Sequence, residues 1–204
     1  MFRSVKRKNR VSKRTPKSRA LRFESLESRV VLSGIVNVQI SPAVAAGTMN
    51  LVGDGSNNEI EIRQTATPGE YSIQGTSGTL LQVNGAGVTM PAVTVNGIAG
   101  AITSDLGGGN DTLSFLGIAA GCQSNIPTNL TITNGSGSNN NVISDVLING
   151  SLAVVKNGAT SGYRELEIRN STIIGDTLVN NVGSGSGDTK TLIVNSSLQG
   201  GVAT

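Results

Sequence analysis

The chain has 204 residues with no His, no Trp and a single Cys. Without imidazoles it lacks the commonest general base and transition-metal ligand, and one Cys can neither close an internal disulfide nor build a zinc site. The net charge of +3 averages a basic leader and an acidic body, so it does not indicate a nucleic-acid-binding domain. No stretch approaches the roughly 20 apolar residues of a membrane span. We expect Cys122 to be a small buried hydrophobe, with pairing between molecules as the alternative.

The charge is unevenly distributed along the chain. Residues 1–29 carry eleven Lys or Arg against two Glu, whereas residues 30–204 carry five against eleven acidic residues. We therefore interpret residues 1–33 as a disordered basic leader and residues 34–204 as the folded domain.

The end of the leader, LRFESLESRVVLS, resembles the LEPR-XLL signature near the N-terminus of large extracellular proteins of planctomycete bacteria. Ser28 stands where that signature has a proline, and Val31 where it has a leucine. The resemblance implies export to the cell surface or beyond. The alternative is a basic tail without a targeting role. The matching residues are Leu21, Arg22, Phe23, Glu24, Leu26, Glu27, Arg29, Leu32 and Ser33.

Residues 34–134 contain short apolar stretches separated by Gly and Pro turn signals. In EIEIRQ, Ile60 and Ile62 alternate with charged residues, the period of a strand buried on one face. We predict that residues 34–134 form irregular opening coils and a cap, with a separate small β domain as the alternative. The candidate strands are residues 35–40, 49–52, 59–63, 70–75, 79–83, 93–97, 101–106 and 111–116.

The stretch LGGGNDTLSF, residues 106–115, resembles the glycine-rich nonapeptide of RTX-type calcium-binding β-rolls. Gly107, Gly109, Asp111 and Leu113 match, but the motif occurs once. The resemblance implies a Ca²⁺ site at Asp111, with Asp105 as a second ligand. The alternative is a tight glycine turn without metal. We expect no other cofactor.

Residues 135–204 repeat with a period of 25 residues. Short polar residues recur at Asp145, Asn170 and Asn195, a pattern typical of a turn or corner. When the repeats are aligned in rows of 25 residues, four columns carry the same residue in all three rows. They are Ser136, Ser161 and Ser186; Gly137, Gly162 and Gly187; Ile143, Ile168 and Ile193; and Gly150, Gly175 and Gly200.

A chain of short strands that returns to its start every 25 residues predicts an all-β fold, a parallel β-helix (β-solenoid). Each coil would lie about 4.8 Å from the next, so identical positions stack. Ile143, Ile168 and Ile193 would then form a core ladder. An antiparallel β-sandwich is the alternative, because the same alternation permits it.

These features predict a noncatalytic extracellular or cell-surface structural or adhesive protein, either complete or the front of a larger one. The expected partners are glycans, matrix proteins or a second copy bound at an uncovered solenoid edge. The alternative is a Ca²⁺-dependent RTX-like binding module. We do not expect an enzyme: Glu165, Glu167 and Arg169 are the best acid/base candidates, but neighbouring charges of this kind more often form a surface pair.

Overall fold

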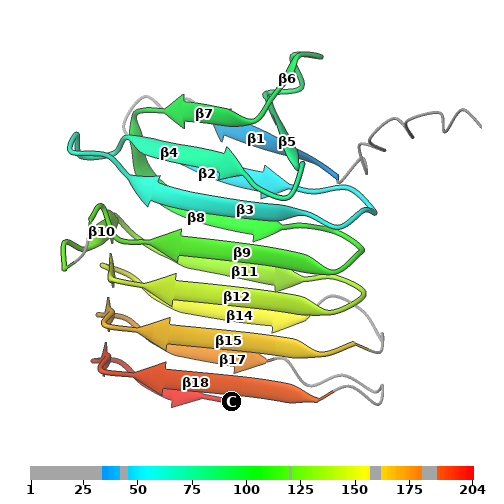
Figure 1. Cartoon of the computed structure of the whole chain (residues 1–204). Coiled ribbons are helices and arrows are strands. Elements are labelled where there is room, and N and C mark those ends of the chain that lie inside the picture. Colours follow the sequence, from blue (N-terminus) through cyan, green and yellow to red (C-terminus); the bar gives the residue numbers. More distant parts are fainter. Residues whose placement is uncertain (1–33, 42–45, 120, 157–161, 181–187) are drawn as a thin grey trace, which may run out of the picture.

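The computed structural model describes residues 34–41, 46–119, 121–156, 162–180 and 188–204. These residues form strands and turns, and no helix occurs among them. The chain winds in stacked coils, and its strands form three sheets around one core (Figure 1). The chain is a β-solenoid, as the repeat predicts.

The sheets form three sides of the solenoid, here called front, back and side (Figure 1). In spatial order the front sheet contains β18 (Thr189–Val194), β15 (Arg164–Arg169), β12 (Asn139–Ser144), β9 (Asp111–Leu116), β3 (Glu59–Gln64), β4 (Tyr71–Gly75) and β7 (Ala92–Val95). The back sheet contains β20 (Val202–Ala203), β17 (Thr177–Asn180), β14 (Leu152–Lys156), β11 (Leu130–Asn134), β8 (Ile98–Asp105), β2 (Gly47–Val52), β1 (Ile35–Ser41), β5 (Leu80–Val83) and β6 (Thr89–Met90). The side sheet contains β10 (Ser124–Ile126), β13 (Val146–Ile148), β16 (Thr172–Ile173) and β19 (Ser197–Leu198).

One coil runs from a back strand through a glycine-rich turn to a front strand, then through a tight corner to a side strand. β11, β12 and β13 form such a coil, and β14, β15 and β16 form the next, each strand parallel to its counterpart. In the front sheet Asn139 pairs with Arg164, and Arg164 with Thr189, which preserves the 25-residue period. The coil before β11 departs from this period, because Asp111 pairs with Asn139.

The predicted isoleucine ladder is present. Ile143 pairs with Ile168, and Ile168 pairs with Ile193. Phe115 and Ile62 continue the same column upward. Ile143 and Ile168 are fully buried, whereas the side chain of Ile193 in the last coil is 43% exposed. Burial of such a side chain stabilises the fold by roughly 1.5–3 kcal/mol, so most of the column contributes to the core and its last member contributes less.

The predicted short polar residues do lie at a corner. Asp145, Asn170 and Asn195 each follow a front strand and have positive φ values of 58°, 48° and 49°. Asp and Asn tolerate this left-handed geometry better than other residues with a side chain. They turn the chain from the front sheet into the side sheet.

The glycine columns mark places where successive coils approach closely. A Cβ atom on Gly162 would lie 2.1 Å from the carbonyl oxygen of Gly137, and one on Gly200 would lie 2.4 Å from that of Gly175. The carbonyl of one coil thus occupies the space that a side chain would need in the next. Ser161, Ser186 and Gly187 of the predicted columns lie outside the described residues.

The N-terminal end differs from the coils because antiparallel strands close it. β1 pairs antiparallel with β2 in the back sheet. In the front sheet β4 pairs antiparallel with β3, and β7 pairs antiparallel with β4. Tyr71 and Ile73 of β4 are buried. The hydroxyl of Tyr71 donates a hydrogen bond of 2.5 Å to the carbonyl of Asn125, which connects the closing strands to the side sheet.

Candidate functional site

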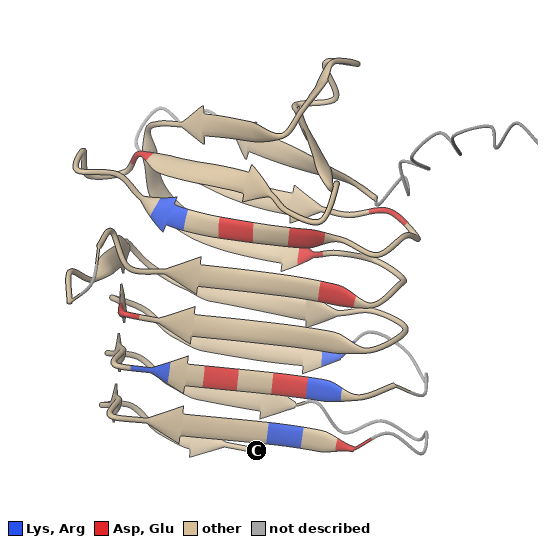
Figure 2. Cartoon of the chain, in the orientation of Figure 1, with Lys and Arg blue, Asp and Glu red and all other residues tan. Residues whose placement is uncertain are grey.

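The outward face of the front sheet carries charge on β3, β15 and β18. Figure 2 shows charged bands on these strands and none on β12, and the red band on β9 is Asp111, which is buried. The outward positions of β9 and β12 are uncharged and separate β3 from β15. Arg63 pairs with Glu61 at 3.6 Å, and Arg169 pairs with Glu167. Charges on adjacent in-register strands would repel if they were alike, so this separation is physically favourable.

Glu165, Glu167 and Arg169, the acid/base candidates, do share the outward side of β15. Glu165 accepts a 2.6 Å hydrogen bond from Lys190 of the next coil. This hydrogen bond holds the pKa of Glu165 below its ordinary value and raises that of Lys190. The arrangement is a set of ion pairs on a solvent-exposed sheet, with β12 presenting the neutral Val142 and Ser144 beside it.

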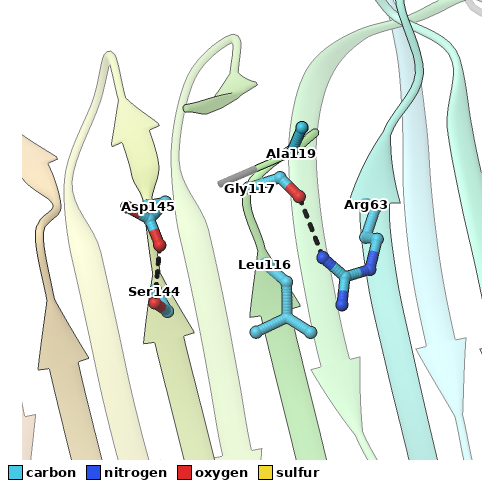
Figure 3. Close-up of a pocket in the computed structure, with 6 residues that line it drawn as sticks. All are labelled: Arg63, Leu116, Gly117, Ala119, Ser144 and Asp145. Carbon is cyan, nitrogen blue, oxygen red and sulfur yellow. Dashed lines mark hydrogen bonds between the residues drawn. The ribbon is translucent and has the colours of Figure 1, made fainter. Parts of the chain in front are cut away.

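A shallow hollow lies at the corner where the front sheet meets the side sheet (Figure 3). Arg63 Nη1 donates to the carbonyl of Gly117 at 3.0 Å, and Ser144 Oγ donates to Asp145 Oδ2 at 2.9 Å. Both charged groups therefore already have partners within the protein. The hollow measures about 210 Å³ and is lined by Arg63, Leu116, Gly117, Ala119, Ser144 and Asp145.

The glycine-rich turn places the predicted calcium ligands Asp111 and Asp105 at its two ends. Asp105 Oδ1 accepts the backbone N–H of Gly107 at 3.1 Å, and Asp111 Oδ1 accepts that of Asn58 at 2.9 Å. Among the described residues no group of three or more acidic, His or Cys side chains is placed to hold a metal ion. Ca²⁺ takes six to eight oxygen ligands, so these donors do not fit such a site. Calcium binding by this chain stays a prediction.

A polar column lies inside the solenoid and corresponds to no sequence motif. Asn139 and Arg164 are inward neighbours of Asp111 along the front sheet, and all three are buried. Arg164 lies on the same side of β15 as Leu166 and Ile168, so the alternation of the sequence RELEIR contained the signal. A buried Arg in a strand is unusual, and the charge count alone does not distinguish it from a surface Arg.

The prediction for Cys122 is wrong. Cys122 is free and exposed. It lies in the connection from Leu116 of β9 to Ser124 of β10, which is longer than the corner at Asp145 that joins β12 to β13. Within this connection Ala119 and Cys122 form an isolated antiparallel β-bridge. The targeting signature, residues 21–33, lies outside the described residues.

The last described coil leaves inward positions uncovered. Ile193 of β18 and Val202 of β20 are 43% and 53% exposed. β18 pairs with β15 on one edge, and β20 pairs with β17. Backbone groups on the other edge of β18 and β20 are available for a further strand.

Comparison with known proteins gives no relative: no family model matches the chain, nor does any curated protein or solved structure. Within the described part of the chain, no helix is sufficiently long and apolar to cross a membrane.

Proposed function

We propose that this chain is a noncatalytic structural or adhesive protein of the cell surface or extracellular space. Its in-register coils form a scaffold, and the outward charges of β15 are paired, Glu167 with Arg169 and Glu165 with Lys190 of β18. The observation that carries the proposal is the uncovered edge of the last coil, where Ile193 continues a core column into solvent.

The occupant that this edge fits best is a second copy of the chain. An exposed strand edge with uncovered aliphatic side chains recruits another edge of the same kind. The outermost strands at the N-terminal end, β7 and β6, pair antiparallel with their neighbours, so they do not repeat the strand arrangement of a coil that the last described coil could continue. Pairing of two last coils about a two-fold axis is therefore favoured over a head-to-tail fibre, because an isologous contact closes on itself.

Light scattering of the full chain tests this association. The expected species is a dimer whose fraction falls on dilution. Ile193→Lys places an inward charge at the edge and should yield a monomer with an unchanged strand signal in circular dichroism. Leu192→Lys, on the outward side of the same strand, adds the same charge and should leave the dimer intact. A monodisperse monomer at all concentrations would contradict the proposal.

The extracellular location rests on the resemblance of residues 21–33 to an export signature. Fractionation of the source cells, with mass spectrometry of the mature N-terminus, tests it. The expected result is a processed chain in the surface or secreted fraction. An intact chain found only in the cytosol would overturn the location and, with it, the adhesive role, while leaving the dimer result valid.

A further inference from the structure

One side chain per coil occupies the inner corner behind each glycine-rich turn. Asp111 pairs in register with Asn139, and Asn139 with Arg164. Asn58 precedes Glu59, which pairs with Thr112, so Asn58 stands directly above Asp111. Asn58, Asp111, Asn139 and Arg164 are at most 4% exposed and form one buried polar column.

Three members of this column donate to the carbonyl two residues earlier. Asn58 Nδ2 donates to Ser56 at 2.9 Å, and Asn139 Nδ2 donates to Gly137 at 3.2 Å. Arg164 Nη1 donates to Gly162 at 3.0 Å. A side-chain N–H thus satisfies a turn carbonyl in each of these coils.

The carbonyl of Gly109 belongs to the same stack as those of the neighbouring turns. A Cβ on Gly137 would lie 2.1 Å from the oxygen of Gly109, and one on Gly162 would lie 2.1 Å from that of Gly137. The residue two positions after Gly109 is Asp111. An ionised carboxylate has no proton to donate, so Asp111 interrupts the pattern.

Asp111 uses one of its two oxygens. Oδ1 accepts the N–H of Asn58, whereas Oδ2 is buried without a hydrogen-bond partner. Asp54, on the turn above, differs, because its oxygens accept backbone N–H groups of both Ile35 and Ser56. Burial works against ionisation of Asp54, but these hydrogen bonds outweigh it and hold its pKa below the ordinary value.

The surroundings of Asp111 favour its neutral form. The charged groups that act on it from the adjoining elements are Asp54 on the turn before β3 and Asp105 at the end of β8, both negative. Asn58 and Asn139, above and below it, are neutral. Burial, with a smaller contribution from the two neighbouring carboxylates, raises the pKa of Asp111 to about 7 against the opposing hydrogen bonds of Asn58.

We propose that Asp111 is a neutral carboxylic acid in the folded protein and that its Oδ2–H donates to the carbonyl of Gly109. The acid proton then plays the part of the amide protons of Asn58 and Asn139. Loss of that proton to solvent places a negative charge between β3 and β9, where the closed end meets the regular coils. The junction is therefore a pH-sensitive point of the fold.

The sign of the effect follows from linkage. The pKa of Asp111 is higher in the folded chain than in the unfolded chain, where it is near 4. Its contribution to stability is fully present below the unfolded pKa and is lost as the pH rises through the folded pKa of about 7. Above that pH the loss is complete and constant.

Thermal unfolding of the full chain and of Asp111→Asn tests the proposal. Asn supplies a permanent Nδ2–H donor, as at the two neighbouring positions. We expect the two melting temperatures to agree at about pH 4 and the variant to melt at least about 5 °C higher at pH 8. Asp188→Asn removes the same charge at an exposed position, so subtracting its effect removes the contribution of net charge.

Two results would overturn the proposal. One is a melting-temperature difference between Asp111→Asn and the unmodified chain that does not change with pH. The other is stabilisation by millimolar Ca²⁺ at pH 8 in the unmodified chain and not in the variant, since this would make Oδ2 a metal ligand. Carbon-13 NMR of the Asp carboxyls gives an independent reading, with a midpoint near 7 expected for Asp111 and one near 4 contradicting it.

Discussion

The core column that contains Ile143 and Ile168 is buried to different extents at the two described ends of the solenoid. At the closed end Ile73 is fully buried, because β4 and β7 fold back antiparallel over the opening coil. At the other end Ile193 continues the column with 43% of its surface exposed. A parallel stack has no intrinsic end, so an edge strand stays open until another strand pairs with it. Antiparallel strands cover the opening coil, and we propose that a second copy of the chain covers the described edge of β18.

The glycines of the turns differ in how closely a neighbouring coil approaches them. Gly135 lies against the carbonyl of Gly107, whereas a Cβ on Gly55 would meet nothing within 4 Å. Gly135→Ala should therefore give the largest effect, a loss of more than about 4 kcal/mol in unfolding free energy or no folded protein. Gly55→Ala should be neutral. Urea denaturation measures both, and equal effects would contradict the close stacking of the coils.

The ends can be compared directly through truncation of the column. Ile73→Ala should cost about 2–5 kcal/mol of stability, because it leaves a cavity in the closed end. Ile193→Ala should cost under about 1 kcal/mol in the monomer, because that side chain is already partly solvated. Denaturation at concentrations too low for association checks the pair. A larger loss at Ile193 would show that the last coil is covered in the monomer.

The closed end depends also on a polar contact. Tyr71→Phe removes the hydroxyl that bonds the carbonyl of Asn125 at 2.5 Å, and should cost about 1–2 kcal/mol. Hydrogen exchange should then speed up in β4 and β10 before it does in β15. Uniform acceleration throughout the chain would show that the closed end is not a separate unit of stability.

The smallest expected effect is at the corner of the regular coils. Asn170 has a φ of 48°, so Asn170→Ala should cost about 1 kcal/mol, whereas Asn170→Gly should cost little. Differential scanning calorimetry resolves this difference. Equal melting temperatures for the two variants would mean that the left-handed corner is not maintained in solution.

Much of the fold could be predicted from the sequence because two periods act together. Alternation identifies strands such as residues 59–63 and 111–116, and the 25-residue repeat identifies which positions stack. The antiparallel closure could not be predicted, since nothing in residues 70–97 repeats. Pairing direction depends on loop geometry that alternation alone does not encode.

The candidate sites were harder to predict for a physical reason. Asn58, Asp111, Asn139 and Arg164 share one column, but their chemistry differs from coil to coil, so no motif search groups them. These residues can be grouped only once two things are known: that each side chain points inward from its strand, and how the strands of successive coils are aligned. The exposure of Cys122 could not be predicted, because the long connection between β9 and β10 interrupts the register that relates one coil to the next.

The central claim is that equivalent aliphatic side chains stack one coil apart. Methyl NOE measurements on isoleucine-labelled protein test it most directly, because counterparts in adjacent coils are only about 4.8 Å apart along the backbone. The account predicts cross-peaks from Ile168 to both Ile143 and Ile193, and none between Ile143 and Ile193. Absence of both Ile168 cross-peaks, in a folded sample, would contradict it.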